Sequence, residues 1–331
     1  MLRPNKGLVK ALEATPLSIF KPIADLGYFG WKPKGPYKDL AMVTVADIQD
    51  SFDIHMTPPA IVPVEQLSRD LPLPFENLPP RRVIKAYPLG APDIAGLHAA
   101  VRHRGVDMSK VNFFFGRTST LEILATRRID TYSSYFATLI PGTETIMITS
   151  QKDYLLDMAS INFQFRNFAI GKKFGDEIDR AEVNHLQLVE VGEHLVLFST
   201  EVSAMNSNND PVKLASRIRR NWGTKMLYQM ISTGSFTLYS GSRQRSSLIK
   251  VAEHSLPYVA ETTLKGVDID EDESNILNAM SHLVKKHKSD NGYDGGKQAY
   301  EISFDGRNVV MTPCPSENIC VPEAVLRILI H

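Results

Sequence analysis

The sequence predicts an α+β fold in which a mixed β-sheet is flanked by helices, and three observations lead to that prediction. The chain has 331 residues, of which 43% are hydrophobic and 22% are charged, so it can bury one large core or two smaller ones. Short segments with the apolar or alternating pattern of strands are interspersed with segments of helical spacing. Their order lacks the regular strand–helix alternation of a parallel sheet, which favours a mixed sheet covered by helices.

The first 80 residues are rich in proline and glycine and contain few candidate elements. A short helix is expected at 8–13, and the prolines between 58 and 80 break every later candidate helix. We therefore predict an extended N-terminal arm at 1–80 and a compact domain at 81–331. Aromatic side chains of the arm, among them Phe20, Phe29 and Trp31, are expected to anchor it to the core or to a partner subunit.

Helices and strands follow one another irregularly in the domain. Apolar residues at helical spacing predict helices at 91–102, 120–128, 154–170 and 274–286, and a mainly helical segment at 212–232. Alternating or β-branched runs predict strands at 145–149, 185–191, 195–202 and 235–240. The dipeptide Asp305-Gly306 predicts a hairpin with a two-residue turn, because both of its residues tolerate a positive φ.

Composition excludes several classes of protein. No apolar run approaches the roughly 18 residues that span a bilayer, and the opening residues lack the apolar block of a secretory signal, so we expect no membrane partner and no export. The two cysteines, Cys314 and Cys320, fit no four-ligand zinc site and are expected to be buried thiols in a reducing compartment. The sequence has no glycine-rich phosphate loop, nucleophile elbow or paired-histidine metal motif, so no cofactor is expected.

Charge is balanced over the whole chain but uneven along it. The 37 basic and 37 acidic residues give a net charge of zero, so the whole molecule has no general attraction for nucleic acid. No Asp or Glu occurs from 211 to 252, where the basic residues are Lys213, Arg217, Arg219, Arg220, Lys225, Arg243, Arg245 and Lys250. Such a stretch is either a solvated surface or a local binding surface for phosphates, and charge alone does not decide between them.

Five segments resemble, in the same order, motifs of the DXO-type RNA 5′-end decapping exonucleases. Gly171-Lys172-Lys173-Phe174 follows an aromatic helix, as the Gly-aromatic-Lys-Phe-Glu motif does in that family. The later motifs of the family are similar to "HLVLFSTEVSAM" (194–205), "VKLASR" (212–217), "WGTKMLYQMISTGS" (222–235) and the segment 301–328. The resemblance covers 112–331 and implies a DXO-like domain. In that family a divalent metal held by Glu and Asp activates water to remove 5′-terminal nucleotides or incomplete caps.

Most of the metal-binding carboxylates of that family are replaced in this sequence. The motif Glu is Gly175, the Glu-x-Asp pair is Glu201 with Ser203, and the Glu of the Glu-Leu-Lys triad is Lys213. Mg²⁺ and Mn²⁺ need several anionic oxygen ligands. The resemblance therefore implies a protein without catalytic activity, in which Glu201 marks a vestigial metal site and no metal is bound.

The same exchange favours phosphate binding. Two unit charges about 4 Å apart attract by about 4 kcal/mol at an effective dielectric constant near 20, so a few cations could hold a 5′-triphosphate without metal. Arg117 and Gln229 match the family's assisting Arg and Gln. The residues expected to bind RNA 5′ phosphates are Arg117, Lys172, Lys173, Lys213, Arg217, Arg219, Arg220, Lys225, Gln229, Arg243 and Arg245. Three aromatic residues either stack on bases or belong to the core: Phe114, Trp222 and Tyr228.

Two longer segments, "RHRGVDMSKVNFFFGRTSTLEILATRR" (102–128) and "TLIPGTETIMI" (138–148), resemble the guide-RNA-associated protein pair of the kinetoplastid mitochondrial RNA-editing substrate-binding complex. This resemblance implies binding of guide-RNA 5′-triphosphates, a hetero-oligomer with a homologous subunit, further RNA-editing proteins as partners, and a location in the mitochondrial matrix. Two alternatives stay open. One is an active metal-dependent decapping or pyrophosphohydrolase enzyme whose metal site is rebuilt from Asp176 and Glu177. The other is a scaffold that bridges proteins, as in a nuclear DXO relative.

Overall fold

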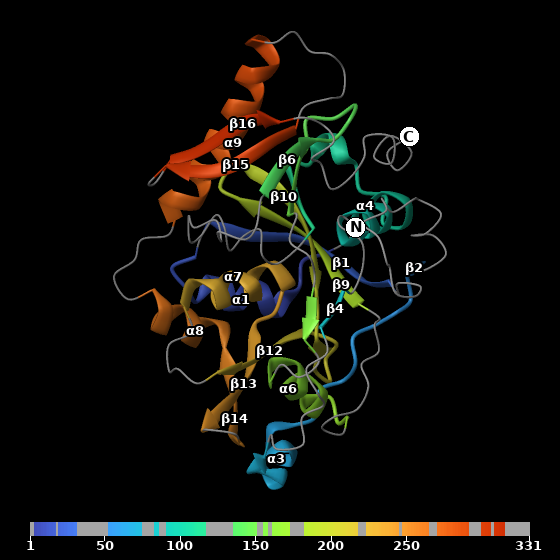
Figure 1. Cartoon of the computed structure of the whole chain (residues 1–331), viewed down its shortest axis with the longest axis vertical. Coiled ribbons are helices and arrows are strands. Elements are labelled where there is room, and N and C mark those ends of the chain that lie inside the picture. The colour runs from blue at the N-terminus through green and yellow to red at the C-terminus, as the bar shows by residue number, and fades with distance from the viewer. Residues whose placement is uncertain are drawn as a thin grey trace.

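The structure is a computed structural model, and it describes residues 3–17, 19–31, 52–74, 83–85, 91–116, 135–150, 155–157, 161–172, 182–217, 223–244, 247–264, 270–290, 299–305 and 308–314. Within these ranges, nine strands form the larger of two main sheets (Figure 1). Their order across the sheet is β16 (Asn308–Cys314), β15 (Ala299–Asp305), β6 (Tyr135–Leu139), β7 (Ile146–Ser150), β5 (Phe113–Phe115), β10 (His194–Glu201), β9 (Glu182–Val191), β1 (Phe20–Trp31) and β2 (Phe52–Asp53).

Both main sheets combine parallel and antiparallel pairs. In the larger sheet, β5 is parallel to β7 and β10, and the other neighbours are antiparallel. The smaller sheet contains β11 (Ala204–Met205), β12 (Pro211–Arg217), β13 (Thr237–Gln244), β14 (Ser247–Ser255) and β3 (Leu73–Pro74), in that order, with β12 parallel to β13. A separate pair joins β4 (Val83–Lys85) to β8 (Leu155–Asp157). The predicted mixed sheet is confirmed.

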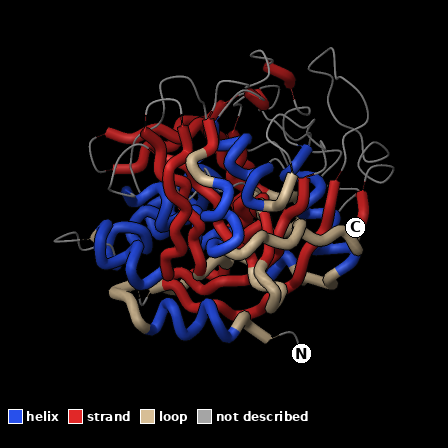
Figure 2. The backbone as a smooth tube through the Cα atoms, turned by 90° about the horizontal axis from the view of Figure 1, so that it is seen from below, coloured by secondary structure: helices blue, strands red, loops and turns tan. Residues whose placement is uncertain are grey.

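Helices cover both sheets. They are α1 (Lys6–Glu13), α3 (Val64–Leu67), α4 (Ala91–His98), α6 (Ile161–Ala169), α7 (Gly223–Thr233), α8 (Leu256–Thr263) and α9 (Asp270–Asp290), with a π-helix at Ala99–His103 and 3-10 turns at Ser68–Asp70 and Met108–Lys110. Figure 2 shows helices on more than one side of the strands. Within the part of the chain that is described, no helix is long and apolar enough to cross a membrane.

The larger sheet is buried on both faces, because successive side chains of its central strand enter different hydrophobic clusters. Val196 and Phe198 of β10 pack into a cluster that also contains residues of α1, α7, α8 and α9. Leu197, which points the opposite way, packs into a second cluster with residues of α4 and β1. A third cluster joins α6 and α3 to the smaller sheet. The predicted α+β fold with helices flanking a mixed sheet is therefore confirmed.

The N-terminal segment is part of the larger sheet. β1 pairs with β9 from Phe20, opposite Val191, to Trp31, opposite Glu182. The side chains of Phe20, Phe29 and Trp31 are buried, so the aromatic residues expected to anchor an arm are core residues of the sheet. Irregular pairing around Pro22 and near Gly27 explains why the sequence pattern of this strand is not a regular alternation.

Most predicted elements are confirmed, and two are corrected. The segment 212–232 contains the predicted helix as α7 but begins as the strand β12, whose Val212 and Leu214 alternate toward α6. The predicted helix 154–170 is α6 preceded by the short strand β8. The hairpin is confirmed with Asp305 paired to Asn308, whereas 120–128 lies outside the described residues.

The buried side chain of His185 on β9 contacts both β1 and the end of α7. His185 Nε2 lies 2.9 Å from Asp25 Oδ1, and His185 Nδ1 lies 3.1 Å from the Thr233 carbonyl oxygen. A carboxylate and a carbonyl oxygen only accept hydrogen bonds, so each of these two contacts needs a proton on the ring nitrogen of His185 that faces it. Gly234, with a φ of +69°, leaves room for this ring, because an added Cβ would lie 3.0 Å from it.

Candidate functional site

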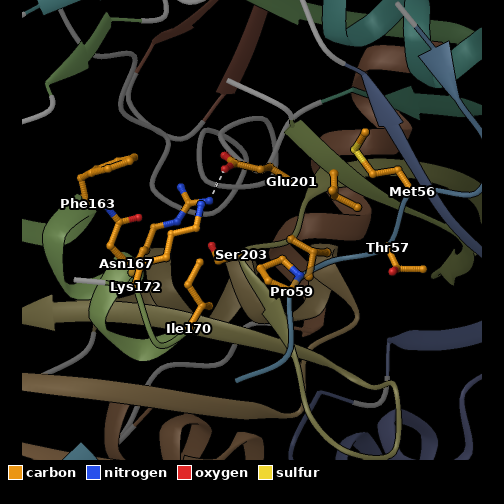
Figure 3. A pocket seen from close by; sticks show the side chains of 12 residues that line it. Met56, Thr57, Pro59, Phe163, Asn167, Ile170, Lys172, Glu201 and Ser203 are labelled. Carbon is orange, nitrogen blue, oxygen red and sulfur yellow. Dashed lines mark hydrogen bonds and ion pairs between the residues drawn. The ribbon is translucent and has the colours of Figure 1, made fainter. Parts of the chain in front are cut away.

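A cavity of about 340 Å³ lies where α6, the segment 56–59 and the end of β10 meet. Figure 3 shows Phe163, Asn167 and Lys172 on one side of it, Met56 and Thr57 on the other, and Glu201 and Ser203 between them. The described residues that line it are Met56, Thr57, Pro59, Phe163, Arg166, Asn167, Ile170, Lys172, Val183, Glu201, Val202 and Ser203.

The amphipathic pattern of α6 directs one helix face to the cavity. Phe163, Arg166 and Ile170 are three and four residues apart and line it, as helical periodicity requires. Phe165 and Phe168 lie on another face of α6 and pack into the core of the smaller sheet, together with Val212 and Leu214. Burial of these two aromatic rings therefore decides which side chains of the helix reach the cavity.

The end of α6 places Lys172 at the cavity. Gly171 has a φ of +75°, its N–H donates to the Phe168 carbonyl over 3.0 Å, and the Lys172 N–H donates to the Asn167 carbonyl over 2.9 Å. These two bonds form a Schellman motif, which closes a helix at a glycine. The prediction that a helix ends at the Gly171 motif is confirmed, and the exposed Lys172 follows that turn.

Glu201 is positioned by the last residues of β10. The preceding Thr200 is buried and its hydroxyl donates to the Ser232 carbonyl over 2.6 Å, which ties this point of the strand to α7. The Val202 N–H donates to the Val183 carbonyl over 2.8 Å. The backbone is therefore fixed on both sides of Glu201, whose side chain is half-buried at the cavity.

The carboxylate of Glu201 is paired with a cation across the cavity. Arg166 Nη2 lies 2.5 Å from Glu201 Oε1, and the two side chains are 29% and 28% exposed (dashed line in Figure 3). A fully exposed pair of this kind contributes less than about 1 kcal/mol. Here solvent screens the charges less, so removal of one partner leaves the other partly desolvated and is more costly.

The described donors do not fit a divalent metal. Among the described lining residues Glu201 is the single carboxylate, and it is already paired with Arg166, while Ser203 stands where the DXO resemblance places an Asp. In the described ranges no group of three or more His, Cys, Asp or Glu residues could hold a metal ion. Arg166 and Lys172 outnumber the carboxylate, so the described lining is net positive and suits an anion.

One polar group in the cavity wall has no partner in the described protein. Asn167 is 4% exposed, and its Nδ2 has no hydrogen-bond partner among the described residues. A buried amide donor without a partner is unusual in a folded protein and marks a position for an acceptor that the described residues do not supply. Asn167 thus adds a donor to the two cations of the cavity.

Comparisons with known proteins give matches among solved structures. No protein-family model matches the sequence, and no curated protein matches it either. Rai1 of S. pombe superposes with a TM-score of 0.61 at 12% identity, over 89% of this chain and 94% of that chain. Dxo1 of K. lactis, solved with manganese, gives 0.60 at 10% identity, over 91% and 92%. Rai1 of Candida albicans, solved with pU5-Mn2+, gives 0.57 at 11% identity, over 94% and 95%.

The chain has the Rai1/Dxo1 fold. These superpositions span nearly the whole of both chains in each comparison, and they confirm the DXO-like fold predicted from the motifs. They include the N-terminal region, so the Rai1/Dxo1 fold extends beyond the segment 112–331 on which the sequence resemblance is based. At 10–12% identity the likeness concerns the fold.

Within the Rai1/Dxo1 fold, the cavity contains two of the predicted site residues, Lys172 and Glu201. Lys213 is half-buried on β12 and does not line it. Since Val212 and Leu214 pack toward α6, Lys213 lies on the other face of the strand, which faces α7. Gln229 on α7 and Arg243 on β13 are half-buried, and Lys225 on α7 is exposed.

Other predicted site residues lie outside the described residues: Arg117, Lys173, Asp176, Glu177, Arg219, Arg220, Trp222 and Arg245. The backbone of Arg217 ends β12, and its side chain is outside the described part of the molecule. Phe114 and Tyr228 are fully buried, so the core interpretation of these two rings is correct. Cys314 is a half-buried free thiol, and Cys320 is outside the described residues.

Sequence reasoning missed Arg166 as a site residue. Its distance along the chain from Glu201 gave no reason to pair them, and it belongs to no motif of the DXO resemblance. The signal that could have found it is its place three residues after Phe163 and four before Ile170, on the helix that carries the Gly171 motif.

Proposed function

We propose that this protein binds the 5′-triphosphate end of RNA and does not cleave it. The observation that carries the proposal is the Arg166–Glu201 pair, which places an arginine at the one carboxylate of the described cavity lining. In a metal-dependent nuclease, a carboxylate at this position would bind the catalytic metal ion and not an arginine. The proposal places the terminal phosphates in the cavity, against Arg166 and Lys172.

The chemistry of the lining supports phosphates as the ligand. A guanidinium can bind two phosphate oxygens at once, and the ammonium of Lys172 adds a second positive charge. Asn167 supplies a neutral donor. A triphosphate carries several negative charges, so it competes effectively with the single charge of Glu201 for Arg166. The carboxylate orients the guanidinium before the ligand enters.

Two further observations support RNA as the molecule that carries the phosphates. Candida albicans Rai1, which shares the fold, was solved with pU5-Mn2+, so one protein of this architecture holds a short 5′-phosphorylated RNA. The stretch from 211 to 252 contains no acidic residue and supplies further cations for the RNA backbone. Absence of catalysis follows in this proposal from the replaced carboxylates.

Binding to one RNA with a 5′-triphosphate, 5′-monophosphate or 5′-hydroxyl tests the proposal. The dissociation constants should rise in that order, with at least a tenfold difference between triphosphate and hydroxyl ends, and the order should persist with chelator. Measurement at two salt concentrations separates end recognition from general attraction to the backbone. Equal affinity for the three ends would refute recognition of the 5′ end.

The same samples test catalysis. Incubation with Mn²⁺ should release neither pyrophosphate nor mononucleotides from triphosphorylated RNA. Release that depends on Mn²⁺ would establish the alternative, an active decapping or pyrophosphohydrolase enzyme with a metal site rebuilt from residues such as Asp176 and Glu177.

We also propose the biological setting that the sequence resemblance implies. The protein binds guide RNA as one subunit of a hetero-oligomer with a homologous chain, within the RNA-editing complex of the mitochondrial matrix. The support is the similarity of 102–128 and 138–148 to the guide-RNA-associated proteins. Affinity purification of the protein from isolated mitochondria should recover guide RNAs and a homologous subunit. A nuclear location without RNA would favour the protein-bridging scaffold.

A further inference from the structure

A cluster of aromatic rings lies at the β2 edge of the larger sheet. Phe52 of β2 is nearly parallel to His103, with ring centroids 4.9 Å apart and an interplanar angle of 19°. It is also nearly parallel to Phe29 of β1, at 5.5 Å and 23°. Phe29 and His98 are buried, Phe52 is half-buried and His103 is exposed. The stack therefore leads from the core to the solvent.

Two contacts orient the ring of His103, one at its edge and one on its face. Its Nε2 lies 3.3 Å from His98 Nε2, so one imidazole donates a hydrogen bond to the other in the plane of the ring. Phe52 covers one face of the ring and fixes its tilt. His98 is itself held edge-on against Phe52, at 5.0 Å and 87°. The exposed ring is thus ordered without a ligand.

The π-helix Ala99–His103 makes this arrangement possible. Its wider turn brings side chains five residues apart to one face, and the Arg104 N–H donates to the Ala99 carbonyl over 3.0 Å in the i to i−5 pattern. In an α-helix, residues 98 and 103 would lie on different faces. Single π-turns of this kind occur often at functional sites. The irregularity therefore presents a histidine that a regular helix would turn away.

The outer face of His103 is suited to a planar apolar partner. One face meets Phe52 and the side chain as a whole is exposed, so the described residues leave part of the ring open to solvent. The next residue, Arg104, is engaged in the fold, because its Nη2 donates to the Tyr28 carbonyl over 3.0 Å. Bases of single-stranded RNA stack on such ordered aromatic rings, including histidine.

Chain connectivity places this ring close to the cavity. Phe52 is four residues before Met56, which lines the cavity, and four residues span at most about 14 Å. Met56 packs so closely on Gly30 of β1 that a Cβ at that glycine would overlap its side chain. The short segment between the stack and the cavity is therefore held against the sheet, and the two features keep a fixed separation.

We propose that His103 is a stacking platform for one of the first bases of a bound single-stranded RNA. The placement of the RNA rests on the proposed function, because phosphates held in the cavity bring the first nucleosides within reach of this ring. A stacked base fits every base type, so the platform adds affinity for single-stranded RNA over free phosphates without adding sequence preference.

The test uses a short single-stranded RNA with a 5′-triphosphate and the fluorescent base 2-aminopurine at nucleotide 1, 2 or 3. Binding to the unaltered protein should quench the fluorescence at one of these positions. His103→Ala should abolish that quenching and weaken RNA binding about 5- to 20-fold, whereas His103→Phe should retain both. His282→Ala, at an exposed histidine of α9, is the matched control and should behave like the unaltered protein.

Competition by inorganic tripolyphosphate separates the platform from the cavity. The inhibition constant of tripolyphosphate should be the same for the unaltered protein and for His103→Ala, because tripolyphosphate carries no base for the platform to contact. Quenching that persists in His103→Ala would overturn the platform and leave 5′-end binding intact. Loss of quenching in His103→Phe as well would also overturn it. Equal affinity for triphosphate and hydroxyl ends would instead overturn the proposed function.

Discussion

Glu201→Gln should tighten the binding of triphosphorylated RNA. In the structure the Glu201 carboxylate accepts a 2.5 Å ion-paired hydrogen bond from Arg166, and in the proposed function it competes with the phosphates for that guanidinium. Glutamine removes the negative charge and keeps an oxygen that accepts a hydrogen bond from Arg166. Arg166 is then available to the ligand and is still oriented.

The magnitude follows from the charge and its exposure. A carboxylate and a phosphate charge roughly 6 Å apart repel by about 3 kcal/mol at an effective dielectric constant near 20. The side chains of Arg166 and Glu201 are 29% and 28% exposed, so screening by solvent reduces this to roughly 1–2 kcal/mol. The dissociation constant should therefore fall by a factor of about 5–30.

Fluorescence anisotropy with a labelled triphosphorylated RNA, in chelator and at constant salt, measures this change. Glu190→Gln is the matched control, because Glu190 on β9 is also ion-paired, with Lys21 at 2.9 Å, but its side chain is 38% exposed and does not belong to the described lining of the cavity. The control should bind as the unaltered protein does. Weaker binding of the RNA by Glu201→Gln than by the unaltered protein would contradict this reasoning. So would an increase in RNA affinity on addition of Mn²⁺ that occurs in the unaltered protein and not in Glu201→Gln, because the carboxylate would then be a metal ligand.

Three further predictions concern charge, packing and pH. Lys172→Glu should weaken binding of triphosphorylated RNA at least threefold more than Lys250→Glu in the same anisotropy assay, because Lys172 lines the cavity and Lys250 is an exposed residue of β14 outside it; equal losses would indicate a diffuse electrostatic surface. Gly234→Ala should lower the free energy of unfolding in urea by about 1–3 kcal/mol, because its Cβ would crowd His185 at a positive φ; an unchanged value would contradict the packing described. Burial raises the pKa of the Asp25 carboxyl, but the hydrogen bond and charge interaction with His185, the Gly27 N–H and the charge of Arg104 together outweigh burial and lower the pKa below the ordinary value. This stabilisation is therefore complete above the ordinary pKa and is lost as pH falls through the lowered one. Urea unfolding below about pH 4 should depend less on pH in Asp25→Asn, and unaltered pH dependence would refute the role of the pair.

Local sequence patterns predicted the parts of the fold that depend on near neighbours. Apolar residues at helical spacing are enough to find α9, and the alternation of side chains is enough to find β9 and β10. The hairpin of β15 and β16 followed from a turn signal of two residues. Each of these signals lies within about a dozen residues of chain, which is why no long-range information was needed.

Local patterns failed where distant segments decide the structure. β1 contains a proline and two glycines and reads as an irregular arm, yet its pairing with β9 and burial of Phe29 and Trp31 make it a strand of the main sheet. Lys213 was expected in the pocket of Glu201, but alternation along β12 places it on the face opposite α6. The local preference of a segment for a strand is weak evidence, and contacts with distant strands and helices decide both the pairing of β1 and the face on which Lys213 lies.

The sequence by itself determined the chemical character of each side chain at the site, such as the cations Arg166 and Lys172 and the carboxylate Glu201, because this character is a property of the residues and not of their arrangement. Only the tertiary structure decided which groups meet. Arg166 reaches Glu201 because two aromatic rings of α6 are buried against the smaller sheet, and that burial turns the arginine toward the end of β10. Contacts between residues 35 positions apart depend on packing of whole elements, for which a local pattern carries no information.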